Sequence, residues 1–161
     1  MVTIRKLTSS DLKAFMTWGG DPQVTHSLFW DHYQNQEEAL TFLKNIVDPH
    51  PWFKAICLNG TPIGAITLDQ GKARGVQRAE LGYVLAKDYW GKGYATEAVK
   101  LALESGFQDL GVCRIEAYVD PANLGSVKVL QKSGMEQEAY LKQYVVHRRV
   151  IKDRLVFAKT I

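Results

Sequence analysis

The fold of this 161-residue chain is decided by one stretch, Trp90-Gly91-Lys92-Gly93-Tyr94-Ala95-Thr96-Glu97. Strand-like residues precede it, and from Tyr94 the apolar residues recur at the spacing of one helix face. A helix start has unpaired backbone N–H groups and a positive dipole end, and glycines just before it let those groups approach an anion closely. The stretch therefore predicts an anion-binding turn between a strand and a long helix.

The spacing of the glycines excludes two common phosphate-binding motifs. The dinucleotide fingerprint requires Gly or Ala at its last position, where this chain has Thr96. A Walker loop requires Gly-Lys-Ser/Thr four residues after its first glycine, and no such run follows Gly91. From spacing alone, two interpretations remain: a pyrophosphate site to which Lys92 adds charge, or a turn that only packs a helix on a sheet.

Periodicity and turn residues predict the elements on either side. An Asn59-Gly60 turn between strands indicates a hairpin, Asp21-Pro22 indicates a loop, and Gly134 is placed to end a helix. The predicted strands cover 2–7, 52–58, 62–68, 79–86, 112–119 and two segments within 136–159 around 147–149; the predicted helices cover 9–18, 36–47, 94 onward and 124–132. Hairpins and helical crossovers together imply an α/β (α+β) fold with a mixed sheet flanked by helices, in a single domain over 1–161.

Composition excludes several classes of protein. The chain is 46% hydrophobic and 23% charged, as in soluble globular proteins, and its net charge of +3 is too small to indicate nucleic acid binding. The sequence shows no signal peptide or membrane span, so we expect a cytoplasmic protein with no membrane partner. Cys57 and Cys113 are expected to be buried thiols, and His32, His50 and His147 lack metal-ligand spacing, so no metal is predicted.

Two blocks of sequence carry a specific resemblance. The first joins 79–85 to the stretch 89–98, and the second joins Asp120-Pro121-Ala122-Asn123-Leu124-Gly125-Ser126 to 129–135. In this order they resemble the GNAT N-acetyltransferases, and within them the RimJ/RimL-like branch, which acetylates N-terminal amines of ribosomal proteins. Trp90 departs from that family's pattern, which has Gln or Arg there, and Met135 stands where the branch commonly has an aromatic residue.

The resemblance implies a GNAT-like, mostly antiparallel sheet of about six or seven strands with about four helices and a splayed central strand pair. It also implies acetyl-CoA as the cofactor, held mainly by backbone groups near the glycine turn. The cofactor-binding residues that it implies are Tyr83, Val84, Leu85, Trp90, Gly91, Lys92, Gly93, Tyr94, Ala95, Thr96, Asn123 and Ser126.

Candidate catalytic residues follow from the chemistry of acetyl transfer to an amine. The amine must lose a proton, and Glu80 is the candidate base, acting through water. The alternative for Glu80 is a solvent-facing or arginine-paired strand residue. Ser126 stands where the resembled branch has a serine near the CoA sulfur and is the candidate acid; Tyr140 or Tyr144 is the alternative. Asn123 also suits the N-cap of the following helix.

The acceptor is expected to be a primary amine, and the resemblance favours a protein or peptide N-terminal α-amine that attacks directly in a ternary complex. Phe29, Trp30 and Tyr144 are the candidate acceptor-binding residues, although large aromatics such as Phe29 and Trp30 are more often core. Alternatives are an acetyltransferase for a small amine, such as a polyamine or antibiotic, and a non-catalytic acyl-CoA-binding module. A monomer or a homodimer fits the sequence.

Overall fold

Seven strands form one sheet in the computed structural model, which describes residues 1–161. The strand order is β1-β2-β3-β4-β5-β7-β6, and the β4–β5 pair is parallel. The strands are β1 Val2–Lys6, β2 Phe53–Leu58, β3 Thr61–Gln70, β4 Arg78–Leu85, β5 Arg114–Val119, β6 Glu136–His147 and β7 Val150–Thr160. The predicted mixed, mostly antiparallel α/β fold is confirmed.

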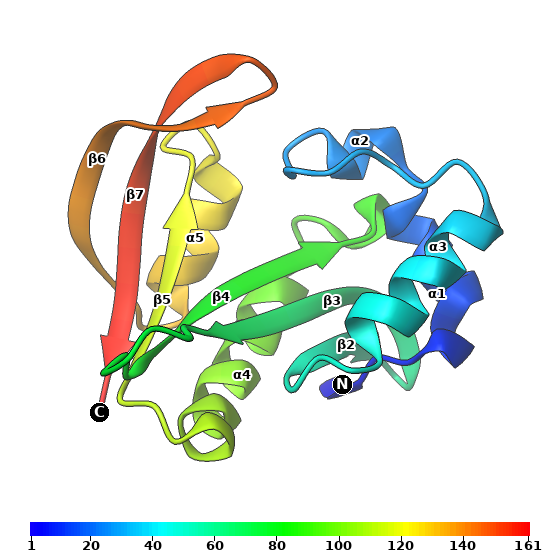
Figure 1. The fold of residues 1–161 in the computed structure, drawn as a ribbon, viewed down its shortest axis with the longest axis horizontal. Coiled ribbons are helices and arrows are strands. Elements are labelled where there is room, and N and C mark those ends of the chain that lie inside the picture. The colour runs from blue at the N-terminus through cyan, green and yellow to red at the C-terminus, as the bar shows by residue number, and fades with distance from the viewer. The chain divides into compact units, whose positions relative to one another are not determined.

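The chain divides into two compact units. Unit 1 comprises Met1–Thr67 and Tyr83–Ala98, and unit 2 comprises Leu68–Gly82 and Val99–Ile161. Strands β3 and β4 and the long helix α4 (Tyr94–Leu110) each contribute residues to both units. Figure 1 labels these three elements on the ribbon.

Unit 1 contains the β1–β2–β3 antiparallel strands and the first helices. These are α1 (Leu12–Gly19), α2 (Pro22–Thr25) and α3 (Gln36–Phe42), the last continued by a π-helical turn at Leu43–Val47. Asp21 caps α2 by accepting a hydrogen bond from the Gln23 amide, and a proline opens the helix. This short helix corrects the prediction of a loop at Asp21-Pro22 and brings the α-helices to five.

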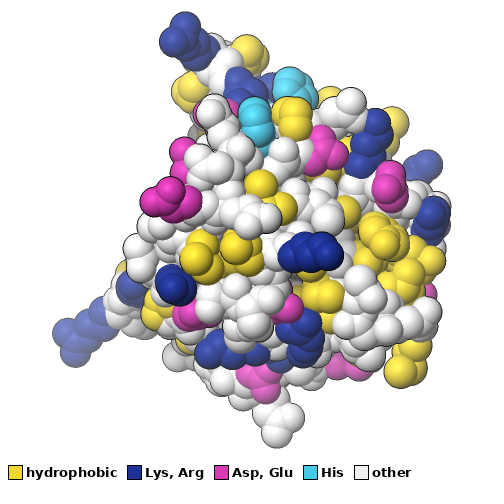
Figure 2. All heavy atoms as spheres, turned by 90° about the vertical axis from the view of Figure 1, so that its right-hand side faces the viewer, with side chains coloured by type: hydrophobic (Ala, Val, Ile, Leu, Met, Phe, Trp, Pro, Cys, Tyr) yellow, Lys and Arg dark blue, Asp and Glu magenta, His cyan; other side chains and the backbone are white.

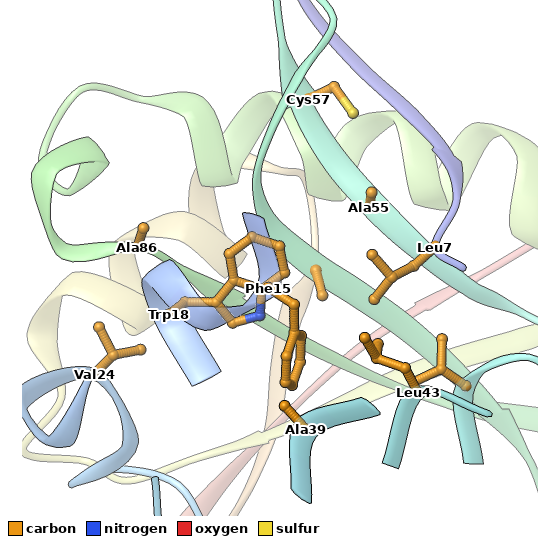
Figure 3. Close-up of a cluster of buried hydrophobic side chains, with 11 residues drawn as sticks. Leu7, Phe15, Trp18, Val24, Ala39, Leu43, Ala55, Cys57 and Ala86 are labelled. Atoms are coloured by element: carbon orange, nitrogen blue, oxygen red, sulfur yellow. The ribbon is translucent and has the colours of Figure 1, made fainter. Parts of the chain in front are cut away.

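The core of unit 1 gathers around the Phe15 and Trp18 rings (Figure 3). The two rings meet edge to face with centroids 5.5 Å apart, and both side chains are buried. Leu7, Val24, Ala39, Leu43, Ala55, Cys57 and Ala86 complete the cluster labelled there. Burial of this much aromatic and aliphatic surface is the main stabilising term for unit 1.

The predicted hairpin between β2 and β3 is confirmed. Asn59 and Gly60 have φ of 49° and 86°, the left-handed conformations that a two-residue reversed turn requires. The Met1 ammonium donates to the Asn59 side chain at 2.7 Å, so the turn also anchors the start of the chain.

Unit 2 packs α4 and α5 (Leu124–Lys132) with the remaining strands. A side chain at Gly106 of α4 would collide with Leu68 and Ile115, so the absence of a Cβ lets helix and strands approach closely. On β5, Ile115, Ala117 and Val119 are buried. Alternation along β5 places Arg114, Glu116 and Tyr118 on the opposite face.

The two cysteines differ in environment. Cys57 is buried in the unit 1 cluster, as predicted, and burial raises the pKa of its thiol. Cys113 is exposed, which corrects the prediction, because it lies just before β5 begins and not within the strand. Both are free thiols. No helix of the chain is both long and apolar enough to cross a membrane.

Candidate active site

The glycine turn of unit 1 has the backbone geometry of an anion cradle. Gly91 and Gly93 have φ of 73° and 86°, and a Cβ added at either would meet no atom within 4 Å. Gly93 accepts the first helical hydrogen bond of α4, from the Glu97 amide at 3.1 Å, so the glycine turn leads directly into the first turn of this helix. Open space beside left-handed glycines at a helix start fits a pyrophosphate, and a side chain would fill it.

Trp90 has a structural role in this turn. Its indole Nε1 donates to the Leu85 carbonyl at 2.9 Å while the side chain remains 47% exposed. The bond ties the turn to the end of β4. Trp90 therefore holds the loop in place through a hydrogen bond to the protein backbone. Its indole N–H is used in this bond and does not bind an anion.

Lys92 is the cation nearest to the glycines in sequence. Its ammonium donates to the Asp88 carbonyl at 2.8 Å and lies 5.9 Å from the centroid of the Tyr89 ring. The side chain is exposed, so exchanging this carbonyl for an anion costs little desolvation.

The end of β4 in unit 1 approaches β3 closely at a glycine. A Cβ at Gly64 of β3 would collide with the Val84 carbonyl oxygen and with Leu85. The Ala86 amide donates to the Ile63 carbonyl at 2.8 Å, which holds the strand end in place. Tyr83 and Val84 are partly buried and Leu85 is buried.

The parallel ladder between β4 and β5 is short, as the prediction of a splayed central pair requires. It contains the pairs Arg78–Arg114, Ala79–Ile115 and Glu80–Glu116 and ends there, although β4 continues to Leu85 and β5 to Val119. Backbone groups of β4 beyond Glu80 therefore have no partner in this ladder.

Glu80 lies in unit 2 at this last pair. The residue is exposed to solvent, yet neighbouring residues desolvate part of its carboxyl group, and this desolvation is the largest cause that raises its pKa. The carboxylates of Asp69 and Glu116 raise the pKa further, whereas Arg78 lowers it. A carboxylate whose pKa is raised is a stronger base than an ordinary glutamate.

The second sequence block begins α5 in unit 2. The Asn123 side chain caps the helix by accepting from the Ser126 amide at 3.2 Å, as predicted. Asn123 is exposed and Ser126 partly so. Capping uses one amide oxygen and leaves the Asn123 NH₂ group able to donate to a ligand.

The tyrosines of unit 2 fall into two arrangements. Tyr140 donates to Asp153 at 2.6 Å, and this bond raises the pKa of the phenol. Tyr144 stacks on Tyr118, with ring centroids 5.7 Å apart and planes 3° apart, and is 53% exposed. Burial and the adjacent Glu116 raise the pKa of Tyr118 to about 12.

The two early aromatics of unit 1 differ in exposure. Trp30 packs into an aromatic cluster, 5.4 Å from the Tyr33 ring and 6.5 Å from the Phe42 ring. Phe29 is 65% exposed. The face of the molecule in Figure 2 carries Lys, Arg, Asp and Glu side chains interspersed with apolar ones. No charge of one sign dominates this face.

Sequence reasoning missed one feature of unit 2, the ion-pair network around Glu116. Glu116 is 7% exposed and binds Arg78 at 3.1 Å and Arg114 at 2.8 Å. Arg78 is far from Glu116 in the chain, and only the parallel register brings them together. Charged residues at alternate positions of a predicted strand were the one available signal.

The comparisons with known proteins agree with this geometry. Residues 1–136 match the model of the acetyltransferase (GNAT) domain. An uncharacterized N-acetyltransferase p20 of Bacillus licheniformis is 30% identical over 152 residues, covering 89% of this chain and 83% of the relative. Spermidine N(1)-acetyltransferase of Escherichia coli (strain K12) is 28% identical over 146 residues, covering 87% and 75%.

The chain is also similar to solved structures of acetyltransferases. A GNAT-family acetyltransferase from Bacillus anthracis has a TM-score of 0.86 at 27% identity, covering 99% of this chain and 94% of that one. RimJ of Mycobacterium smegmatis, solved with a CoA disulfide, has a TM-score of 0.81 at 26% identity, covering 99% and 81%.

A mixed sheet with a short parallel ladder, followed by a glycine turn at a helix start, defines a class of enzymes that take acyl groups from CoA. The chain belongs to the GNAT acetyltransferases. It is an acetyl-CoA-dependent N-acetyltransferase whose partners are acetyl-CoA and an amine acceptor.

Proposed function

We propose that the acceptor is the N-terminal α-amine of a protein or peptide, and that it attacks the acetyl group directly in a ternary complex. Glu80 carries this proposal: it lies where the β4–β5 ladder ends, and its pKa is raised mainly by partial burial. An α-amine has a pKa of about 8, against about 10.4 for a lysine amine, so a carboxylate base suffices for it near neutral pH.

The glycine turn of unit 1 is the proposed pyrophosphate site. Backbone amides beside Gly91 and Gly93 would hold the phosphates, with Lys92 adding charge, because the space beside both glycines is open. Trp90 would position this turn through its bond to Leu85. The helix start over Tyr94, Ala95 and Thr96 would complete the site.

The remaining cofactor contacts are proposed at two further places. In unit 1, backbone groups at Tyr83, Val84 and Leu85 would bind the extended pantetheine arm as an added strand would. In unit 2, Asn123 would donate from its amide while continuing to cap α5. Acetyl-CoA supplies the acetyl group, and CoA leaves as a thiol once it has gained a proton.

Proton transfer is assigned to Glu80 and Ser126. Glu80 would accept the amine proton through water, and Ser126, at the start of α5, would supply the proton for the leaving thiol. Tyr140 is a poorer acid than an ordinary tyrosine, because its hydroxyl already donates a hydrogen bond to Asp153 and this bond raises the pKa of the phenol. Tyr144 is the remaining alternative to Ser126.

Phe29, Trp30 and Tyr144 are the proposed acceptor-binding residues. Phe29 and Tyr144 each expose more than half of the side chain, so each offers an aromatic surface to a peptide. Trp30 packs on Tyr33 and Phe42, so it would shape the acceptor-binding surface mainly by holding its neighbours in place.

A small polyamine is the second candidate acceptor. The observation that favours it is the similarity to the spermidine N(1)-acetyltransferase of Escherichia coli. A polyamine carries several positive charges, so its binding should weaken steeply as salt is raised, whereas binding of a neutral peptide should not.

An acceptor screen tests the proposal. Three acceptors are compared at equal concentration: a peptide with a free N-terminus and no lysine, the same peptide with a blocked N-terminus and one lysine, and spermidine. Acetylated products are measured by mass spectrometry, because the exposed Cys113 would react with reagents that detect CoA thiol. The proposal predicts the highest kcat/KM for the free N-terminus; a highest value for spermidine or the lysine peptide contradicts it.

A further inference from the structure

Glu116 on β5 is a buried carboxylate to which the proposed chemistry gives no task. It forms an ion pair with Arg78, whose Nε lies 3.1 Å from a carboxylate oxygen, and it accepts hydrogen bonds from Arg114 Nε at 2.8 Å and from the Tyr118 hydroxyl at 3.3 Å. Only 7% of the residue is exposed. A buried carboxylate is tolerated only when it is paired and hydrogen-bonded, and the two arginines and the Tyr118 hydroxyl meet this condition for Glu116.

The parallel register places Glu116 directly beside Glu80. The two residues form the last pair of the β4–β5 ladder, so their side chains leave the same face of the sheet. Arg78 precedes Glu80 by two residues on β4 and therefore shares this face. The salt bridges of this face run to Glu116 and Glu138, and none runs to Glu80.

We infer that Glu116 is a positioning residue for the proposed base: it engages the guanidinium of Arg78 and so leaves the Glu80 carboxylate without a cation partner, open to accept a proton. The inference rests on the proposed function of Glu80. In the step concerned, the ammonium of the acceptor loses a proton that water passes to the Glu80 carboxylate. Glu116 takes no part in this proton transfer.

The charges around Glu80 support the inference that Glu116, and not Glu80, is the ion-pair partner of Arg78. Asp69 of β3 and Glu116 of β5 favour its protonated form, and Arg78 of its own strand favours the ionised form. Arg114 of β5 is neutralised by Glu116 and by Glu138, which binds it at 2.7 Å. If Arg78 turned from Glu116 to Glu80, the pKa of Glu80 would fall and it would be a weaker base.

Two substitutions should move the titration of Glu80 in opposite directions. Glu116→Gln removes a negative neighbour and releases Arg78, so the titration moves to lower pH. Arg78→Met removes the cation, so it moves to higher pH. Glu138→Gln is the matched control: it also breaks an ion pair of Arg114, but Glu138 is not among the charges that act on Glu80.

The titration is followed by carbon NMR of the Glu80 carboxyl in the full chain, with the signal assigned by its loss in Glu80→Gln. This readout needs no acceptor. The acidic limb of the pH–kcat/KM profile is measured in parallel. Opposite shifts with an unmoved Glu138→Gln titration support the inference; shifts in one direction, no shift, or an equal shift in Glu138→Gln overturn it.

The two proposals fail separately. Opposite NMR shifts with a pH–rate profile that Glu80→Gln leaves unchanged overturn Glu80 as the base, while the charge arrangement stands. If Glu116→Gln does not fold, the Glu80 titration in Arg78→Met tests the inference by itself. This variant should fold, because the Arg78 side chain is 52% exposed and its loss leaves the core intact. An upward shift supports the inference and its absence overturns it.

Discussion

At the scale of single residues, Glu80 links the stability of the fold to its proposed chemistry. Its pKa is raised in the folded chain, mainly by partial burial, so folding favours its protonated form. The penalty for its ionised form is absent below the ordinary glutamate pKa and appears as the pH rises through the folded pKa.

Glu80→Gln should therefore stabilise the chain near neutral pH and leave it unchanged near pH 4. The gain should be less than about 1 kcal/mol, because the side chain is exposed and solvent screens its interactions. Urea unfolding of both proteins at the two pH values checks this. A variant less stable than the parent at neutral pH would show that Glu80 makes favourable contacts as an anion.

At the scale of elements, the turn that leads into α1 depends on one carboxylate. Asp11 closes a capping box by accepting from the Thr8 amide at 3.1 Å and binds Arg5 with both oxygens, at 2.8 and 2.9 Å. The bond from Arg5 is the largest cause that lowers the pKa of Asp11. This stabilisation is present above the ordinary aspartate pKa and lost as pH falls through the lowered one.

Asp11→Asn should cost about 1 to 2 kcal/mol of unfolding free energy near neutral pH. The difference from the parent should shrink under acid conditions, where Asp11 itself becomes protonated. Asp88→Asn is the control, because it removes one carboxylate from an exposed position. Equal losses in both variants would mean that net charge, and not the capping box, is responsible.

The α5 cap allows capping and cofactor binding to be separated. Asn123→Ala should cost about 1 kcal/mol, and Asn123→Ser should restore the stability because serine is also a good N-cap. If Asn123 also donates to the cofactor, Asn123→Ser should fold fully yet bind acetyl-CoA more weakly. Calorimetric titration measures the affinity; full affinity in Asn123→Ser would leave capping as the only role.

Local signals predicted most elements for physical reasons. Asn59-Gly60 has few conformations other than a reversed turn, and the Asn123 cap and Gly134 stop set the bounds of α5 at Leu124–Lys132. Asp21-Pro22 was wrongly read as a loop. Asp and Pro open turns and short helices alike, and only the packing of Val24 into the core decides between them.

At the scale of the whole molecule, sheet register determined what sequence reasoning missed. The glycine turn before α4 was predictable because it is built from consecutive residues. The ion pairs of Arg78 and Arg114 with Glu116 were not predictable, because they form only when two strands that are distant in sequence pair in parallel. Trp90 was predictable in part. The sequence shows that it departs from the family pattern, but its hydrogen bond to the Leu85 carbonyl could not be predicted from the sequence.

Saturating acetyl-CoA should raise the melting temperature of the whole chain. A ligand at about 100 times its Kd adds about 2.7 kcal/mol, which for a chain of 161 residues corresponds to a rise of roughly 5–11 °C. NAD at the same concentration should give no rise, because Thr96 breaks the dinucleotide fingerprint. A larger rise with NAD than with acetyl-CoA would reverse the assignment of the turn.

The most direct test of the central claim, that acetyl-CoA is held by the backbone of the glycine turn, is its calorimetric Kd in two matched variants. Gly93 and Gly60 both have φ of 86° and open space beside them, so an alanine at either should cost a similar 1 to 2 kcal/mol or so in backbone strain. We predict that Gly93→Ala weakens acetyl-CoA binding at least about tenfold, a loss of about 1.4 kcal/mol, while Gly60→Ala binds as tightly as the parent. Equal affinity in the two variants would contradict the account.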